Sequence, residues 1–296
     1  MENTQEYQIV RRGNLFPKEL EWFYSGVFPN YGTAPEIIDV RNTGLKNFMD
    51  QFRIESDQKL VDILKGQTNL SNGELITLNQ RKLRFPVWRT EFGKVLTSGK
   101  QGQIIVSPLV VGGFEKINFK FKPMEEDSLK FKMEIHSHPS SLVLSQGDVS
   151  SIFTGKLSIQ IACNDNGYCL AFPTKESPIP QGTDFEDDFW QFGDYGISKR
   201  DSESRKIRKI KNARQELLDQ LIVQFGKVEL SSFFGEKLVE RKTDPVEIND
   251  KGVALIQLYK LLLLSNKYKV PTYFMEKDGF VFNRLNKVTD IFPELL

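Results

Sequence analysis

The amino-acid sequence predicts an α/β fold, with a central unit between an N-terminal extension and a C-terminal α+β lobe. Three observations favour this fold. β-rich segments cluster between residues 73 and 172, a short helical pattern interrupts them, and two long helical patterns follow residue 200. We expect the chain to divide into residues 1–72, 73–182 and 183–296. Its 296 residues are enough for more than one hydrophobic core.

Local periodicity and turn residues predict the elements of the first two segments. Helical spacing predicts a helix near Ser56 to Lys65 and the first turns of another over Gly147 to Phe153. Short β-rich runs bounded by turn residues predict five strands, and Asn166-Gly167 predicts a hairpin turn. The strands are Glu74 to Leu78, Gly93 to Thr97, Gln103 to Val106, Lys116 to Phe121 and Lys130 to His136.

The C-terminal lobe follows an aromatic and acidic stretch, residues 184–194, which predicts a connector. Beyond it, Ser202 to Phe225 is expected to form an amphipathic helix and Asp250 to Tyr268 a second helix. Thr272 to Phe282 is expected to form a hairpin that turns at Lys277-Asp278-Gly279. The lobe contains no cluster of ligand or nucleophile residues, so we expect it to bind a protein partner.

Charge and hydropathy exclude several classes of function. Forty basic and 39 acidic residues give a net charge of +1, which argues against nucleic-acid binding. The basic run from Lys199 to Arg214 fits the solvated face of a helix. The apolar stretch from Val253 to Leu264 is shorter than the roughly 20 residues that cross a bilayer, so no membrane span is expected. Met1 to Arg12 lacks the apolar core of a secretory signal, and we expect a cytoplasmic protein.

The two cysteines, Cys163 and Cys169, are too few for a disulfide scaffold or a four-cysteine zinc site. They flank the Asn166-Gly167 turn, so they could face each other across the two strands of the hairpin. In a reducing cytosol the favoured interpretation is two reduced, half-buried thiols.

The two histidines of the chain, His136 and His138, are one residue apart at the end of a predicted strand. Residues i and i+2 of a strand point to the same face, so one metal ion can bridge both imidazoles. Asp148 follows ten residues later. Two imidazoles and a carboxylate suit Zn²⁺, and three protein ligands leave the fourth tetrahedral position for water, as in catalytic sites.

A different interpretation needs no metal. Ser145 and Asp148 have the spacing of a helix-capping box, with Ser145 at the N-cap and Asp148 at the third helical position. The histidines would then be an accidental pair on an exposed strand, and the chain could be a plain interaction protein.

His136-Ser137-His138-Pro139 followed by Ser145-Gln146-Gly147-Asp148 resembles the H-x-H-P…S-x-x-D signature of the JAMM (MPN+) metalloproteases. This family includes deubiquitinating isopeptidases. The resemblance covers about a third of the chain and implies a mixed central sheet with flanking helices. It also implies that His136, His138 and Asp148 ligate zinc, and that Ser145 helps to hold the oxyanion. The implied reaction is hydrolysis of the amide bond after the C-terminal tail of a ubiquitin-like protein.

The resemblance also requires a glutamate from an earlier strand as the general base. Glu91 is the favoured candidate, because it stands at the start of a predicted strand. Lys94 occupies a position where family members usually carry a small residue, although Gly93 lies one position earlier. Glu134 is the alternative, since alternation puts it on the strand face of both histidines, where a role in orienting His136 is expected instead.

Three further possibilities remain open at this point. The zinc site could serve a peptidase that acts on another small protein or a carrier protein. The chain could also be a catalytically silent MPN scaffold in a protein complex. The acidic segment Pro123 to Leu129 could form one wall of a substrate groove, or it could be a solvated turn.

Overall fold

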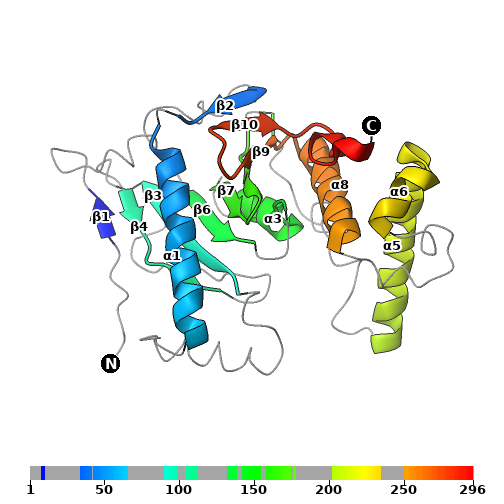
Figure 1. The fold of residues 1–296 in the computed structure, drawn as a ribbon, viewed down its shortest axis with the longest axis horizontal. Helices are drawn as coiled ribbons and strands as arrows, with labels where there is room; N and C mark the ends of the chain where they lie inside the picture. The colour runs from blue at the N-terminus through cyan, green and yellow to red at the C-terminus, as the bar shows by residue number, and fades with distance from the viewer. Residues whose placement is uncertain are drawn as a thin grey trace.

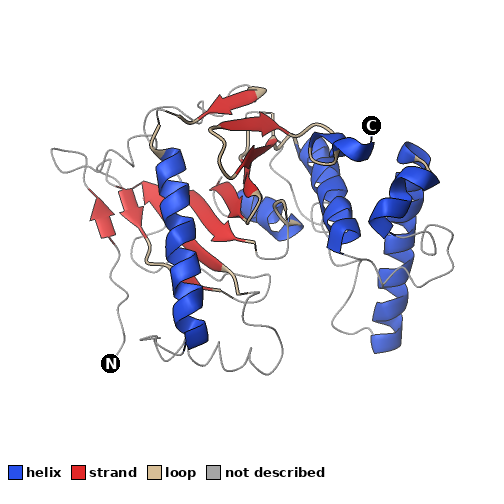
Figure 2. Ribbon diagram, viewed as in Figure 1, coloured by secondary structure: helices blue, strands red, loops and turns tan. Residues whose placement is uncertain are grey.

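In the computed structural model, the residues described are 8–10, 34–41, 43–65, 90–98, 104–112, 132–138, 142–154, 158–174, 176–177, 202–234 and 250–295. These residues form helices and strands in mixed order, which confirms the predicted α/β class. Figure 1 and Figure 2 show strands running across the molecule with helices packed against them.

One mixed sheet has the strand order β1-β4-β3-β6-β7-β8-β9-β10-β2, and β5 also pairs with β3. The β6–β7 pair is parallel, whereas the other pairs between described strands are antiparallel. A parallel pair needs a crossover, and helix α3 lies between β6 and β7 in the chain. The strands are β1 Gln8–Val10, β2 Ile37–Asp39, β3 Phe92–Ser98, β4 Ile104–Val106, β5 Val110–Val111, β6 Lys132–Ser137, β7 Ser158–Cys163, β8 Gly167–Ala171, β9 Thr272–Glu276 and β10 Val281–Arg284.

Helices cover both faces of this sheet and define two hydrophobic clusters. Helix α1 packs on one face, and α3 and α8 pack on the other, with α5 and α6 beyond α8 (Figure 1). Among the helices that the structure describes, none is both long and apolar enough to cross a membrane. The helices are α1 Leu45–Lys65, α3 Gln146–Thr154, α5 Glu203–Phe225, α6 Lys227–Phe234 and α8 Asp250–Tyr268, with short 3-10 helices at Val288–Asp290 and Pro293–Leu295.

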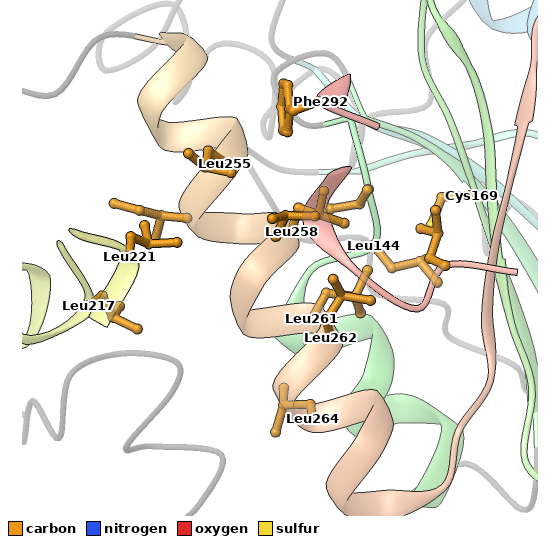
Figure 3. Close-up of a cluster of buried hydrophobic side chains, with 14 of the residues drawn as sticks. Leu144, Cys169, Leu217, Leu221, Leu255, Leu258, Leu261, Leu262, Leu264 and Phe292 are labelled. Carbon is orange, nitrogen blue, oxygen red and sulfur yellow. The ribbon is translucent and has the colours of Figure 1, made fainter. Parts of the chain in front are cut away.

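Helix α8 lies at the centre of the larger hydrophobic cluster. Figure 3 shows its leucines between Leu217 and Leu221 of α5 on one side and Leu144 and Cys169 on the other. This position explains why α8 is apolar around most of its circumference. Leu144 belongs to the loop before α3, so the cluster that α8 completes also anchors this loop.

Several predicted elements agree with the structure within a few residues. Helix α8 coincides with the predicted helix, and α5 begins after Ser202, whose side chain accepts the Arg205 N–H as the N-cap. Helix α1 is longer than predicted and starts at Leu45. The predicted strands Glu74 to Leu78 and Lys116 to Phe121 lie outside the described residues.

The sheet contains strands from all three predicted segments. The C-terminal hairpin β9–β10 extends the central strands, because Leu170 of β8 pairs with Tyr273 of β9. The N-terminal strand β2 then pairs with β10. The Tyr273 hydroxyl also donates to the Pro35 carbonyl at 2.8 Å. Both predicted boundaries and the predicted connector fall outside the described residues, so the division into domains stays a prediction.

The two cysteines are free and buried, and they do not face each other. Cys163 pairs with Tyr168 across the hairpin, while Cys169 pairs with Ala162. This one-residue offset puts the two thiols on opposite faces of the sheet, because side chains alternate along a strand. Burial raises the pKa of the Cys169 thiol to about 12, so it remains protonated.

Candidate metal centre

Two histidines and one aspartate meet at the carboxyl end of β6. His136 lies in β6 and His138 directly follows it, so alternation points both imidazoles to one sheet face. The Nε2 atoms of the two histidines are 2.9 Å apart. Asp148 Oδ1 lies 3.1 Å from His136 Nε2, and Asp148 Oδ2 lies 3.3 Å from His138 Nε2. Each residue offers a ligand atom, and these atoms all lie within 4.8 Å of one another, so the group can hold a metal ion.

The first turn of α3 orients Asp148. The Ser145 N–H and hydroxyl donate to Asp148 Oδ2 at 2.7 and 2.8 Å, and the Asp148 N–H donates back to Ser145 Oγ at 3.3 Å. This reciprocal pair is the capping box that the spacing predicted. The same carboxylate caps the helix and contacts both imidazoles. The two interpretations of Asp148, as a cap and as a ligand, are therefore compatible.

The cluster is buried and its charges are coupled. His136 and His138 are only 5% and 6% exposed. Burial acts to lower the pKa of His136, but the Asp148 carboxylate and the charge of Glu134 outweigh burial and raise this pKa. Burial acts to raise the pKa of Asp148, but the two histidines hold it well below its usual value. Asp148 therefore presents an ionised carboxylate to a cation at neutral pH.

The backbone holds the other ring nitrogen of His138. Nδ1 lies 2.9 Å from the Val143 carbonyl oxygen. A carbonyl can only accept, so Nδ1 carries the hydrogen and the Nε2 lone pair of the neutral ring is available to a metal. Val143 is fully buried, and Asn164 Nδ2 donates to the neighbouring Leu142 carbonyl at 2.8 Å. The turn between β7 and β8 thus supports the loop that orients His138.

Glu91 lies immediately before β3, next to the end of β6. Gly93 pairs with His136, and side chains two residues apart on a strand share a face. Glu91, two residues before Gly93, therefore lies on the sheet face that carries the imidazoles. Glu91 is 6% exposed. Because Gly93 has no side chain, its β3 position puts no side chain directly opposite His136. Strand pairing thus puts Glu91 on the same sheet face as His136 and near the end of β6. Its role as the general base stays a prediction.

Glu134 is also on this face, but it lies deeper along β6, opposite Val95. Its Oε2 atom accepts a hydrogen bond from Gln160 Nε2 of β7 at 2.7 Å. Its charge contributes to the raised pKa of His136. The role of Glu134 in orienting His136 stays a prediction.

Sequence reasoning missed the residues that hold the site in place. Val143 acts through its carbonyl, which leaves no signal in a side-chain motif. Asn164 stands two residues before the Asn166-Gly167 turn signal. Its Oδ1 accepts the Asn166 and Gly167 N–H groups, while its Nδ2 donates to the loop before α3. An asparagine at the start of a turn can accept hydrogen bonds through Oδ1 and donate through Nδ2 at the same time. The residue type at position 164 was therefore the signal in the sequence for such a contact.

Comparisons of the chain with protein-family models, with curated proteins and with solved structures found no match. The chemistry of the cluster itself indicates the type of ligand. Two imidazole nitrogens and a carboxylate oxygen suit divalent transition metals, whereas magnesium and calcium prefer oxygen donors alone. The donor set, the fixed His138 tautomer and the ionised Asp148 all fit such a cation.

Proposed function

We propose that this chain is a zinc-dependent peptidase or isopeptidase that hydrolyses the amide bond after the C-terminal tail of a ubiquitin-like protein. The observation that carries the proposal is the meeting of His136, His138 and Asp148 at the end of β6. Their H-x-H-P…S-x-x-D spacing resembles that of the JAMM metalloproteases, and this resemblance supports the substrate class. The acidic segment Pro123 to Leu129, which could form a groove wall or a solvated turn, lies outside the described residues.

The three ligand residues would hold zinc through the two Nε2 atoms and a carboxylate oxygen of Asp148. Zinc bound there supplies a Lewis acid that activates water and polarises a substrate carbonyl at neutral pH. Val143 keeps the His138 ring in the tautomer that this role requires. The Ser145 N–H keeps the Asp148 carboxylate directed at the histidines.

Glu91 is the proposed general base. Its carboxylate takes a proton from the attacking water and delivers it to the leaving nitrogen as the C–N bond breaks. The water oxygen becomes part of the new carboxyl group, and Glu91 returns to its ionised form. Ser145 is exposed at the N-terminal end of α3, so its hydroxyl can turn from Asp148 to the substrate carbonyl oxygen and donate to it.

Metal analysis and a hydrolysis assay on the purified 296-residue chain test the proposal. We expect about one zinc per chain, and cleavage of both an isopeptide-linked ubiquitin dimer and a fluorogenic aminocoumarin amide of ubiquitin. The double variant His136→Ala/His138→Ala should lose both properties. Full zinc content in that variant would contradict the metal site. Zinc binding with cleavage of short peptides alone would favour another protein substrate, and zinc binding without any cleavage would favour a silent scaffold.

A further inference from the structure

Ser137 lies between the two histidines in sequence, but alternation turns its side chain to the other face of the sheet. Its Oγ atom accepts the backbone N–H of Phe92 at 2.8 Å. The carbonyl of the same peptide unit, that of Glu91, accepts the Gly112 N–H at 2.7 Å. The peptide that joins Glu91 to Phe92 is therefore held from both sides, by β6 and by the residue after β5.

We propose that Ser137 is a positioning residue that fixes Glu91 relative to the metal ligands. The inference rests on the proposed function, in which Glu91 is the general base. The Glu91 side chain leaves the backbone next to the peptide that the Ser137 hydroxyl holds. Because Ser137 separates the two histidines, its hydrogen bond adds a side-chain link next to Glu91 to the backbone ladder that pairs β3 with β6. A shift of about 1 Å in such a group can reduce a rate by about 10²-fold.

The same strand offers a matched control. Ser107 lies after β4, and its Oγ atom accepts the Val95 N–H at 2.8 Å. Both serines thus use a hydroxyl to accept a buried N–H of β3. The Ser107 bond lies further along the strand from Glu91, so removing it should not move the Glu91 carboxylate.

The experiment compares Ser137→Ala, Ser107→Ala and Glu91→Gln in the full chain loaded with Co²⁺. Metal content, melting temperature and the visible cobalt spectrum across a pH series are measured for each variant. The spectrum reports charged groups around the metal and needs no substrate. Threonine and valine have nearly the same shape, but only threonine has a hydroxyl. A second pair of variants, Ser137→Thr and Ser137→Val, therefore tests the hydroxyl even if Ser137→Ala folds poorly.

We expect every variant to bind one Co²⁺. Glu91→Gln should shift the pH midpoint of the spectral change, and Ser137→Ala and Ser137→Val should shift it in the same direction. Ser107→Ala and Ser137→Thr should keep the parent midpoint. With the fluorogenic ubiquitin amide, Ser137→Ala should lower kcat at least about tenfold while KM changes less than about twofold, because the base is displaced and substrate binding is not.

The outcomes separate this inference from the proposed function. A shift in Glu91→Gln without one in Ser137→Ala or Ser137→Val would overturn the role of Ser137 alone. If cobalt-loaded Glu91→Gln kept the parent midpoint, Glu91 would not be the base. The positioning role proposed for Ser137 would then be wrong as well. Equal shifts in Ser107→Ala and Ser137→Ala would show that any loosening of β3 has this effect, which also overturns a specific role for Ser137.

Discussion

At the scale of single residues, Asp148 combines two tasks that usually belong to different side chains. It accepts hydrogen bonds from Ser145 as part of a helix cap, and it contacts both imidazoles. The cap fixes the carboxylate in the absence of a metal, so binding a cation there would require little reorganisation of Asp148. The same arrangement means that the stability of α3 and the affinity for metal share one residue.

This sharing predicts different results for two substitutions of Asp148. Asp148→Asn keeps a side-chain oxygen for the cap but removes the charge, so the fold should persist while zinc content falls well below one per chain. Asp148→Ala keeps the bond from its own N–H to Ser145 Oγ but removes the acceptor of the Ser145 N–H, and should cost about 1 kcal/mol of additional stability. Metal analysis and denaturant unfolding in the presence of a chelator measure the two effects. Equal zinc content in Asp148→Asn and the parent protein would contradict the ligand role.

The two glutamates should differ in their effect on hydrolysis. Glu91→Gln should leave zinc content and fold intact while kcat falls at least about 10²-fold, because the proton acceptor is lost and the metal is retained. Glu134→Gln should have a milder effect, since Glu134 accepts a hydrogen bond from Gln160 and acts on His136 through its charge. Steady-state kinetics on the fluorogenic ubiquitin amide measure both. The reverse order of effects would move the base to Glu134.

At the scale of elements, the site depends on the loop before α3 and on the hairpin turn that supports it. The sequence was sufficient to predict the end of β6, the start of α3 and the turn between β7 and β8, since each has a local pattern. It did not predict that Asn164 of that turn would contact the Leu142 carbonyl. This contact joins segments 22 residues apart, and no periodicity or turn rule reports which distant carbonyl a side chain will reach.

Asn164→Asp tests the contribution of this contact to the site. The aspartate keeps an oxygen for the N–H groups of the turn but loses the donor to Leu142, so the support of Val143 and His138 should weaken. We expect zinc affinity to fall about 10- to 100-fold, the range found for residues that orient metal ligands. Asn166→Asp makes the same chemical change at an exposed position of the turn and is the control. Competition with a zinc-sensitive dye measures both affinities, and equal losses would show that added charge is the cause.

At the scale of the whole molecule, one sheet contains strands from all three segments that the sequence patterns predicted. Strands β9 and β10 continue the sheet from β8, and β2 follows β10 at its edge. Local patterns predicted the β9–β10 hairpin itself. They could not predict its neighbours, because the pairing of one strand with another far along the chain depends on tertiary packing. Leu144 adds a second link, since it shares a hydrophobic cluster with α8.

This architecture predicts that the chain cannot be shortened before its C-terminal strands. A fragment ending at Asp201 loses β9 and the leucines of α8, which exposes the edge of β8 and the apolar side of the loop before α3. The fragment should aggregate and bind less than one zinc per chain. Size-exclusion chromatography, circular dichroism and metal analysis test this. A monodisperse fragment with full zinc content would show that residues 1–201 form an independent unit.

The pairing of β2 with β10 also has a consequence for protein synthesis. β2 is translated well before β10, so the ladder that pairs Ile38 with Phe282 cannot form until β10 has been made. Until then β8 also lacks β9, and before α8 is made Leu144 lacks the helix that covers it. The three candidate metal ligands are translated well before the strands that complete their surroundings. A nascent chain that does not yet extend through β9 and β10 should therefore hold a metal ion less tightly than the folded chain.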